Sequence, residues 1–206
     1  MQIKLHEHLV QTIQGEGTHA GRLADFVRVY GCPVGCSWCD TGYSVDNGHG
    51  KDIKWDLKEV EEFIDELCSD FIVISGGEPF FWPRLPDFVN LLEAEGFEVA
   101  IETSGTKWKP ISPKTWITLS PKEHLPEVKL KTDPLFWKRA DEIKIIIESR
   151  SDYLYYENEL DQLNTPIFLQ PEYSIDKVAV RQIRNLMIGN PKIRLSGQLH
   201  KYLQLP

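Results

Sequence analysis

The sequence lacks any apolar run long enough to span a lipid bilayer. Its longest uninterrupted runs, such as residues 71–74 and 145–147, are strand-sized, whereas a transmembrane helix needs about 20 apolar residues. Near the N-terminus, His6, Glu7 and His8 stand where a secretory signal peptide would need an apolar core. We therefore expect no membrane anchor and no export signal, which makes the cytoplasm the expected location.

The sequence also lacks internal repeats, low-complexity tracts and linkers rich in Pro, Gly or Ser. A length of 206 residues fits one ordinary domain, because two separate cores would leave each half small and poorly buried. Hydrophobic residues at 41% and charged residues at 26% are typical of a folded globular chain rather than a disordered one. We expect residues 1–206 to form a single domain.

Positive charge is scarce, since 23 Lys and Arg residues against 31 Asp and Glu residues give a formal net charge of −8. Binding to nucleic acid relies on clustered Lys and Arg side chains that face phosphates. The charge balance therefore argues against a nucleic-acid partner and favours a small-molecule substrate.

Cysteine is rare as well, with four in the chain, yet Cys32, Cys36 and Cys39 fall within eight residues. In a cytosolic chain this clustering indicates a metal site rather than disulfides, and pairing two of the three would leave an odd thiol. Cys68 ends an amphipathic stretch and is expected to pack as a small apolar residue.

The sequence does contain an alternation of short β-rich runs and amphipathic stretches, which is typical of a parallel sheet built from βα units. Strands are predicted over residues 25–30, 71–75, 97–102, 116–119, 142–147, 166–169 and 193–195. Helices are predicted over residues 57–67 with Asp56 as the N-cap, 85–95, 134–140, 151–163 and 175–188. About six strands are too few to close an eight-stranded barrel. We therefore expect the α/β class, with an open, partial (β/α) barrel of about six mostly parallel strands.

Polar and glycine-rich segments follow several of the predicted strands. They cover residues 31–39, 76–79, 103–105, 120–122 and 170–171. The carboxyl ends of parallel strands open on the same edge of a sheet, where ligands usually bind. The sequence therefore predicts that these segments converge on one cavity.

The cysteine loop has a spacing that suits an iron–sulfur cluster with one open iron. Three thiolates from Cys32, Cys36 and Cys39 can bind three irons of a cubane cluster and leave the fourth iron without a protein ligand. The alternative is a zinc site, which normally needs four ligands. Asp40 or His49 would then supply the fourth.

The same loop resembles the motif of the radical S-adenosylmethionine (SAM) superfamily, in which an aromatic residue, here Trp38, precedes the last cysteine. Residues 75–79 (SGGEP) resemble the GGEP motif of that superfamily. The resemblance implies a [4Fe–4S] cluster on the three cysteines, with SAM chelating the open iron. The residues implied in cofactor binding are Trp38, Asp40, Gly76, Gly77, Glu78, Ser104, Ser120, Pro121, Lys122 and Gln170, with Glu78 accepting a hydrogen bond from the SAM ammonium.

Further segments resemble one family within the superfamily, the 7-carboxy-7-deazaguanine synthases (QueE) of 7-deazapurine and queuosine biosynthesis. They are IQGEG at 13–17, FVR at 26–28, CDT at 39–41, ETSGT at 102–106, SPK at 120–122, QP at 170–171 and GQLHKY at 197–202, with Pro206 last. The resemblance implies a lyase that converts 6-carboxy-5,6,7,8-tetrahydropterin to 7-carboxy-7-deazaguanine with loss of ammonia. In that reaction SAM is cleaved to a 5′-deoxyadenosyl radical, which takes hydrogen from C6 of the pterin and later returns it.

The family resemblance also implies substrate-binding residues. These are Ile13, Gln14, Gly15, Glu16, Arg28, Ser75 and the α-carboxylate of Pro206, with Thr41 as a ligand of Mg²⁺ beside the substrate carboxylate. Each side chain has a plainer alternative: a surface ion pair for Arg28, a loop cap for Glu16, a turn for Thr41 and a frayed tail for Pro206.

Partners follow from the same expectations. A truncated barrel leaves apolar surface that a second copy can cover, which predicts a homodimer, and the radical reaction needs an electron donor such as flavodoxin or ferredoxin. Two other functions share part of the pattern: a radical SAM activase that acts on a glycine of a partner protein, and a zinc-binding interaction module.

Overall fold

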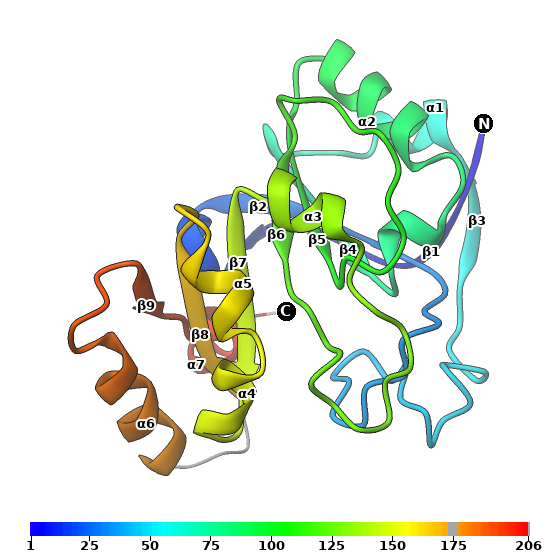
Figure 1. Ribbon diagram of the computed structural model, residues 1–206. Coiled ribbons are helices and arrows are strands. Elements are labelled where there is room, and N and C mark those ends of the chain that lie inside the picture. Colours follow the sequence, from blue (N-terminus) through cyan, green and yellow to red (C-terminus); the bar gives the residue numbers. More distant parts are fainter. Residues whose placement is uncertain (173–176, 206) are drawn as a thin grey trace.

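The computed structural model describes residues 1–172 and 177–205, and in these residues nine strands form one sheet (Figure 1). The strands are β1 (Gln2–Ile13), β2 (Leu23–Val29), β3 (Asp56–Glu59), β4 (Phe71–Gly76), β5 (Glu98–Thr103), β6 (Trp116–Leu119), β7 (Glu142–Ile147), β8 (Ile167–Pro171) and β9 (Ile193–Leu195). Their order is β3-β1-β2-β4-β5-β6-β7-β8-β9. The two edge strands, β3 and β9, do not pair with each other, so the sheet stays open. The strands from β2 to β9 run parallel, while β1 is antiparallel to both β2 and β3. This arrangement confirms the predicted fold class.

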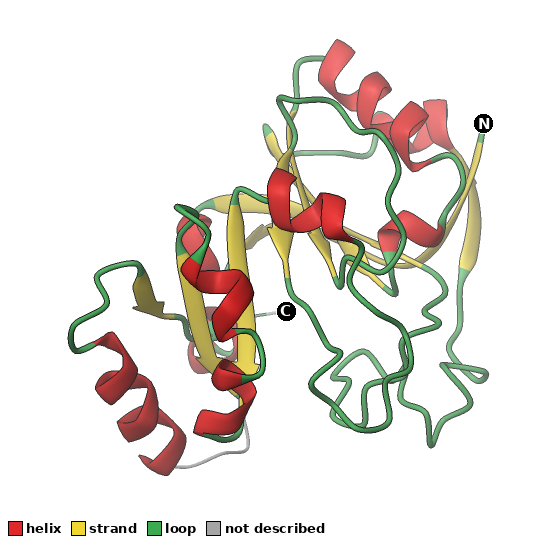
Figure 2. Ribbon diagram, in the orientation of Figure 1, coloured by secondary structure: helices red, strands yellow, loops and turns green. Residues whose placement is uncertain are grey.

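The helices flank the strands in a layered arrangement (Figure 2). They are α1 (Val60–Ile64), α2 (Leu85–Ala94), α3 (Pro134–Arg139), α4 (Arg150–Leu154), α5 (Glu157–Asp161), α6 (Lys177–Met187) and α7 (Leu199–Leu203), with short 3₁₀ turns η1 (Gly17–His19) and η2 (Pro79–Phe81). Helices α2, α3, α4 and α6 contact strands β5, β6, β7 and β9. None of the described helices is both long enough and apolar enough to cross a membrane.

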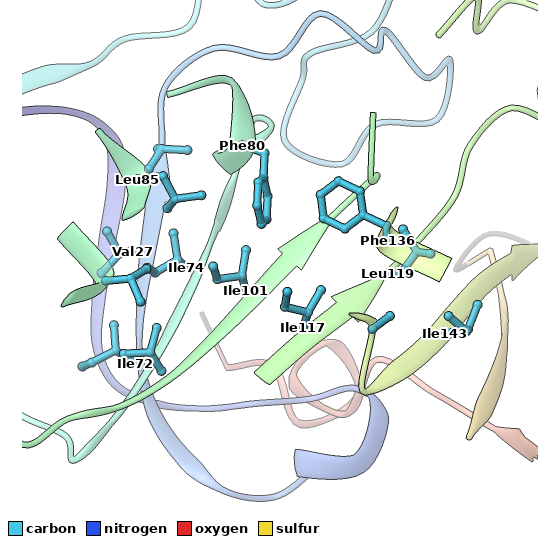
Figure 3. Close-up of a cluster of buried hydrophobic side chains, with 14 of the residues drawn as sticks. Val27, Ile72, Ile74, Phe80, Leu85, Ile101, Ile117, Leu119, Phe136 and Ile143 are labelled. Carbon is cyan, nitrogen blue, oxygen red and sulfur yellow. The ribbon is translucent and has the colours of Figure 1, made fainter. Parts of the chain in front are cut away.

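The two faces of the sheet have different chemistry, because side chains alternate along a strand. On the outer face, buried aliphatic and aromatic residues pack under the helices (Figure 3); they include Val27, Ile72, Ile74, Ile101, Ile117, Ile143 and Phe136. The inner face starts apolar at the amino ends of the strands, with Ala24, Phe71, Val73 and Ala100. Toward the carboxyl ends it becomes polar, with Ser75, Glu102, Thr118, Lys144 and Gln170.

The connection from β1 to β2 folds against the inner face near the amino ends of the strands. The ring of His19 lies 4.9 Å from that of Phe71 and 4.7 Å from that of Trp116, measured between centroids. The backbone N–H of Thr18 donates to Oε2 of Glu142 at 2.9 Å. This turn covers the inner face at the amino ends of the strands, so the space that remains lies near their carboxyl ends.

One predicted element is partly wrong at the N-terminal edge of the sheet. The helix expected from residue 57, with Asp56 as its N-cap, is instead strand β3 over Asp56–Glu59, and α1 begins only at Val60. The reason is a tertiary one: Gln2–Leu5 of β1, a strand that was not predicted, pairs with residues 56–59 and overrides their helical spacing. These two antiparallel strands are also why the sheet exceeds about six strands. The helix predicted over 151–163 is interrupted and forms α4 and α5.

Asp25 on β2 holds a β-bulge in β1. Between positions 9 and 12 the register slips, so that two residues of β1 oppose Asp25 alone, and Gln11 adopts a left-handed φ of 49°. The Asp25 carboxylate is fully buried and accepts hydrogen bonds from Gln11 N at 2.8 Å, Cys68 N at 2.7 Å and Ser69 Oγ at 2.6 Å. Bulges change the direction of a strand, and this one precedes the predicted substrate-binding segment at residues 13–16.

Replacing Asp25 by Ala is expected to lower the free energy of unfolding by about 3 kcal/mol, because three donors lose a buried acceptor. Urea denaturation at pH 7 measures this change. Asp70→Ala, at an exposed position next to the same turn, is the control and should change the free energy by less than about 0.5 kcal/mol. Equal effects of the two substitutions would contradict the role given to Asp25.

Candidate active site

A cavity of about 260 Å³ lies near the carboxyl ends of the parallel strands. The predicted site residues that line it are Ile13, Gln14, Glu16, Arg28, Cys32, Cys36, Trp38, Cys39, Asp40, Thr41, Ser75, Gly76, Gly77, Glu78, Ser104, Ser120, Lys122 and Gln170. They come from all five polar segments named from the sequence, from β2 and from the segment after β1. The expected convergence on one cavity is therefore present.

Of the predicted residues that the structure describes, two do not line this cavity. Gly15 packs against His200 of the C-terminal segment, and its carbonyl accepts a hydrogen bond from Leu199 N at 3.0 Å. Pro121 is buried outside the lining. Pro206 lies outside the described residues. Gly15 thus contributes to the site by allowing the C-terminal helix α7 to approach closely.

The cysteine loop is supported from two sides. The N–H of Gly31 donates to the hydroxyl of buried Tyr43 at 3.1 Å, and the N–H of Ser37 donates to Glu127 at 2.9 Å. All three cysteines of the loop are free thiols. Burial raises the pKa of Cys32 to about 12 and that of Cys36 to about 11. Without a metal to stabilise the thiolates, these groups remain protonated at neutral pH.

The thiols suit a cubane cluster better than a single ion. In the part of the chain that the structure describes, no three His, Cys, Asp or Glu side chains converge as a single metal ion would require. Of the two candidates for a fourth zinc ligand, Asp40 lies 3.2 Å from Lys201 Nζ, and the His49 ring packs against Gly35 within the cysteine loop. A cubane spreads its cysteines because each binds a different iron. The donor set therefore fits a [4Fe–4S] cluster.

The glycine-rich turn after β4 is hydrogen-bonded to the chain that leads into the cysteine loop. Gly77 N donates to Val29 O and Glu78 N donates to Gly31 O, both at 2.9 Å. Gly76 has a left-handed φ of 107°. A Cβ on Gly77 would lie 2.0 Å from the carbonyl oxygen of Gly31, a distance that no side chain permits. Glycine is required here for close backbone contact.

Glu78 links the ends of β4 and β5. Its side chain is only 2% exposed. One carboxylate oxygen accepts bonds from Thr103 Oγ1 at 2.6 Å and Phe80 N at 3.2 Å, and the other accepts from Ser104 N at 2.7 Å and from the Ser104 hydroxyl. The hydrogen bond expected from the SAM ammonium would have to share one of these oxygens. The carboxylate thus also holds Ser104 at the cavity.

The segment after β6 is fixed by its own side chains and by Tyr156. The Lys122 ammonium donates to Ser120 O at 2.7 Å and to the Ser120 hydroxyl, and lies 5.6 Å from the ring centroid of Trp38. His124 follows Lys122 by two residues, and its backbone N and ring Nδ1 lie 3.0 Å and 2.9 Å from the hydroxyl of Tyr156. Burial raises the pKa of Tyr156 and lowers that of His124 to about 4, so both are neutral at pH 7.

The rim of the cavity carries Arg28 and Thr41. The Nε of Arg28 lies 3.3 Å from Glu7 Oε2, so the side chain makes an ion pair at the rim while also lining the cavity. The hydroxyl of Thr41 lies 3.5 Å from Oδ1 of Asp40. Both side chains are available to an anionic ligand, one as a cation and one as a neutral oxygen donor.

A buried group of ions lies within the cavity lining; Glu16 was predicted from the sequence as a site residue, whereas Lys144 and Glu102 were not. The Lys144 ammonium donates to Oε2 of Glu16 at 2.5 Å and to Oε2 of Glu102 at 2.6 Å. The remaining carboxylate oxygens accept bonds from amides: Glu102 from Gln14 at 3.2 Å and Glu16 from Gln198 at 2.9 Å. We call these five residues the floor network. The sequence contained one signal for it, a lysine within the apolar strand EIKIII at 142–147.

Electrostatics within the floor network depends on Lys144. Burial opposes ionisation of Glu16, but attraction to Lys144 and the bonds from Lys144 and Gln198 hold its pKa at about 2. Burial raises the pKa of Glu102, with Lys144 acting in the opposite direction. Burial also disfavours the Lys144 cation, yet the two carboxylates outweigh it and raise the lysine pKa. The lysine is therefore charged, and both carboxylates depend on it.

Comparisons show known proteins that are similar to this chain over most of its length. Residues 26–150 match the model of the radical SAM superfamily. The chain is 36% identical to the 7-carboxy-7-deazaguanine synthase of Buchnera aphidicola over 96% of each chain, and 33% identical to that of Escherichia coli over the whole of both. The crystal structure of QueE from Escherichia coli matches with a TM-score of 0.81 at 32% identity, covering 97% of this chain and 95% of that one. SAM-bound SuiB of Streptococcus suis, at 10% identity and a TM-score of 0.57 over 81% of this chain and 48% of that one, shares the fold.

Gly77→Ala is expected to weaken SAM binding at least about tenfold, because the added methyl group must push the turn away from the Gly31 carbonyl. Calorimetric titration of SAM into anaerobically reconstituted protein, together with its iron content, measures the effect. Gly197→Ala is the matched control, since its Cβ would meet the Tyr202 ring at an ordinary 3.5 Å. Wild-type SAM affinity in Gly77→Ala would refute the close-approach argument.

Proposed function

Because the chain belongs to the 7-carboxy-7-deazaguanine synthase family of the radical SAM superfamily, we propose that it converts 6-carboxy-5,6,7,8-tetrahydropterin to 7-carboxy-7-deazaguanine with loss of ammonia. One observation carries the proposal: a single cavity joins three free thiols, a GGE turn, a rim arginine and the floor network. Membership of this family argues against the glycine-directed activase. The zinc module is disfavoured because, among the described residues, no three His, Cys, Asp or Glu side chains are placed to hold one metal ion.

The cofactor side of the cavity suits SAM and the cluster. When bound, a reduced [4Fe–4S] cluster and SAM supply a 5′-deoxyadenosyl radical, which abstracts the hydrogen at C6 of the pterin. The backbone of Gly76 and Gly77 allows the methionine part to approach, and the Lys122 cation is placed to neutralise its carboxylate. Trp38, Asp40, Ser104, Ser120 and Gln170 complete the proposed SAM site; Pro121 is left out because it lies outside the cavity lining.

At the rim, Arg28 is proposed to bind the substrate carboxylate. A guanidinium pairs with a carboxylate through two parallel hydrogen bonds. The Nε of Arg28 is buried 3.3 Å from Glu7 Oε2 and has no hydrogen-bond partner among the described residues, so it can donate to a ligand. Thr41 is proposed to bind Mg²⁺ together with substrate and water oxygens, which suits an ion that dehydrates reluctantly. Ile13, Gln14, Glu16 and Ser75 are proposed to contact the pterin ring, with the α-carboxylate of Pro206 at its amino end.

The direct test is anaerobic incubation of reconstituted protein with dithionite, SAM and the tetrahydropterin, followed by chromatography for the deazapurine. Product is expected from the wild type and from Cys68→Ser. Cys68, which was expected to pack as a small apolar residue, is instead exposed, and it lies outside the cavity lining. Cys32→Ser should yield neither product nor a full complement of iron. Failure of the iron-loaded wild type to form product would reject the proposed reaction.

Arg28→Ala is expected to raise the KM for the pterin at least about tenfold, because a carboxylate loses its charged partner. Steady-state kinetics measures KM, and titration with SAM should show unchanged affinity. Arg22→Ala is the control: Arg22 pairs with Glu98 at the surface, so its removal should leave KM within about twofold. A wild-type KM in Arg28→Ala would leave only the ion pair with Glu7 as its role.

We further propose that the chain is a single domain that works as a homodimer in the cytoplasm, reduced by flavodoxin or ferredoxin. Large apolar side chains are exposed on β1, β2 and α7, namely Val10, Leu23 and Leu203, which suits a surface that a second copy covers. Light scattering at micromolar concentration should give about twice the 23.8 kDa chain mass. A mass equal to one chain would contradict the dimer.

A further inference from the structure

In the floor network, every carboxylate oxygen accepts a hydrogen bond, so the two glutamates have partners beyond their ion pairs with Lys144. Each carboxylate places one oxygen on Lys144 and the other on a glutamine amide, and Gln14 Oε1 accepts a further bond from Glu16 N at 3.1 Å. The three charged side chains are 8%, 14% and 17% exposed for Lys144, Glu16 and Glu102. All five residues line the cavity. The carboxylates can therefore contact a ligand in the cavity as well as Lys144.

Burial of this kind has a cost that a purely structural role does not explain. Two carboxylates that share one lysine leave one net negative charge in a poorly solvated place, where replacing ions by apolar side chains is often neutral or stabilising. A ligand with N–H donors would offset that cost, because a carboxylate accepts strong charge-assisted hydrogen bonds. The floor is therefore complementary to a ring with several N–H groups.

We propose that Lys144 is a positioning residue: it keeps Glu16 and Glu102 ionised and in place, so that the pair accepts hydrogen bonds from the ring N–H groups of a reduced pterin. This inference rests on the proposed function and deepens it. A tetrahydropterin carries N–H donors at N5 and N8, whereas the fully oxidised ring has lone pairs there and would face the carboxylates without donors. The floor network thereby selects the reduced ring.

Other charged groups around the network have partners of their own. Lys122 is bonded to Ser120, Arg28 pairs with Glu7, and Glu142 accepts from Thr18 N and from Thr118. His200 also faces Glu16, and burial lowers its pKa, so it is neutral at pH 7. Among the described residues, Lys144 is the cation that forms an ion pair with Glu16 or Glu102. Its removal is therefore not compensated from a neighbouring element.

The experiment replaces Lys144 by Met, which keeps the length of the side chain without its charge. The KM for the tetrahydropterin is expected to rise at least about tenfold, with kcat, iron content and SAM affinity within about twofold of the wild type. Loss of the cation raises the pKa of both carboxyls, so acidification now protonates them. Between pH 6 and 8, kcat/KM of Lys144→Met should rise with pH, while the wild-type profile stays flatter.

A second readout concerns selectivity. The wild type should bind the tetrahydropterin at least about tenfold more tightly than 6-carboxypterin, its oxidised form, and Lys144→Met should reduce that ratio. Lys144→Arg, which retains the charge, should restore most of the selectivity and the flatter pH profile. Lys192→Met is the matched control, because Lys192 is partly buried and bonded to Leu163 O at 2.5 Å on another part of the chain.

Unchanged KM, pH profile and selectivity in Lys144→Met, or equal changes in Lys192→Met, would overturn the assignment. If Lys144→Met does not fold, Lys144→Gln is the milder neutral variant. Should neither fold while Lys192→Met does, Lys144 serves the fold itself and the positioning role is wrong. Failure of the proposed function is distinguishable, because the wild type would then form no product from the tetrahydropterin.

Discussion

The buried lysine at the cavity floor is the interaction on which the arrangement of the site most depends. An ammonium group leaves water only where carboxylates and hydrogen bonds replace its hydration. Lys144 meets that requirement with Glu16 and Glu102 at 2.5 and 2.6 Å. Because Gln14 and Gln198 complete the network, the same requirement ties the segment after β1 and the C-terminal segment to strands β5 and β7. The two ends of the chain thus meet at the floor.

The open sheet explains why a polar interior is possible. Its outer face buries a continuous apolar layer under the helices, which provides most of the driving force for folding. Within residues 1–172 and 177–205, no second sheet packs against the inner face, and the turn at η1 covers its amino ends through Thr18 and His19. What remains near the carboxyl ends is a cavity in which charged side chains pair with one another.

The cofactor and substrate sides of the cavity are joined by backbone contacts. The turn after β4 donates hydrogen bonds to the carbonyls of Val29 and Gly31. These bonds hold the GGE segment to the end of β2 and to the start of the cysteine loop. Arg28 lies on that same strand. A displacement of the cysteine loop would therefore also displace Arg28, the residue proposed to bind the substrate carboxylate.

The sequence by itself determined the class of fold and the cofactor side of the site, because both depend on local patterns. The period of the buried strands and the short spacing of Cys32, Cys36 and Cys39 can be read without knowing any long-range contact. Only the tertiary structure decided that residues 56–59 form a strand, since their pairing with β1 overrides local helical spacing. It likewise decided the floor network, because Lys144 lies 128 residues from Glu16 and 42 from Glu102. Charges so far apart in the chain become partners only when the folded sheet removes them together from water.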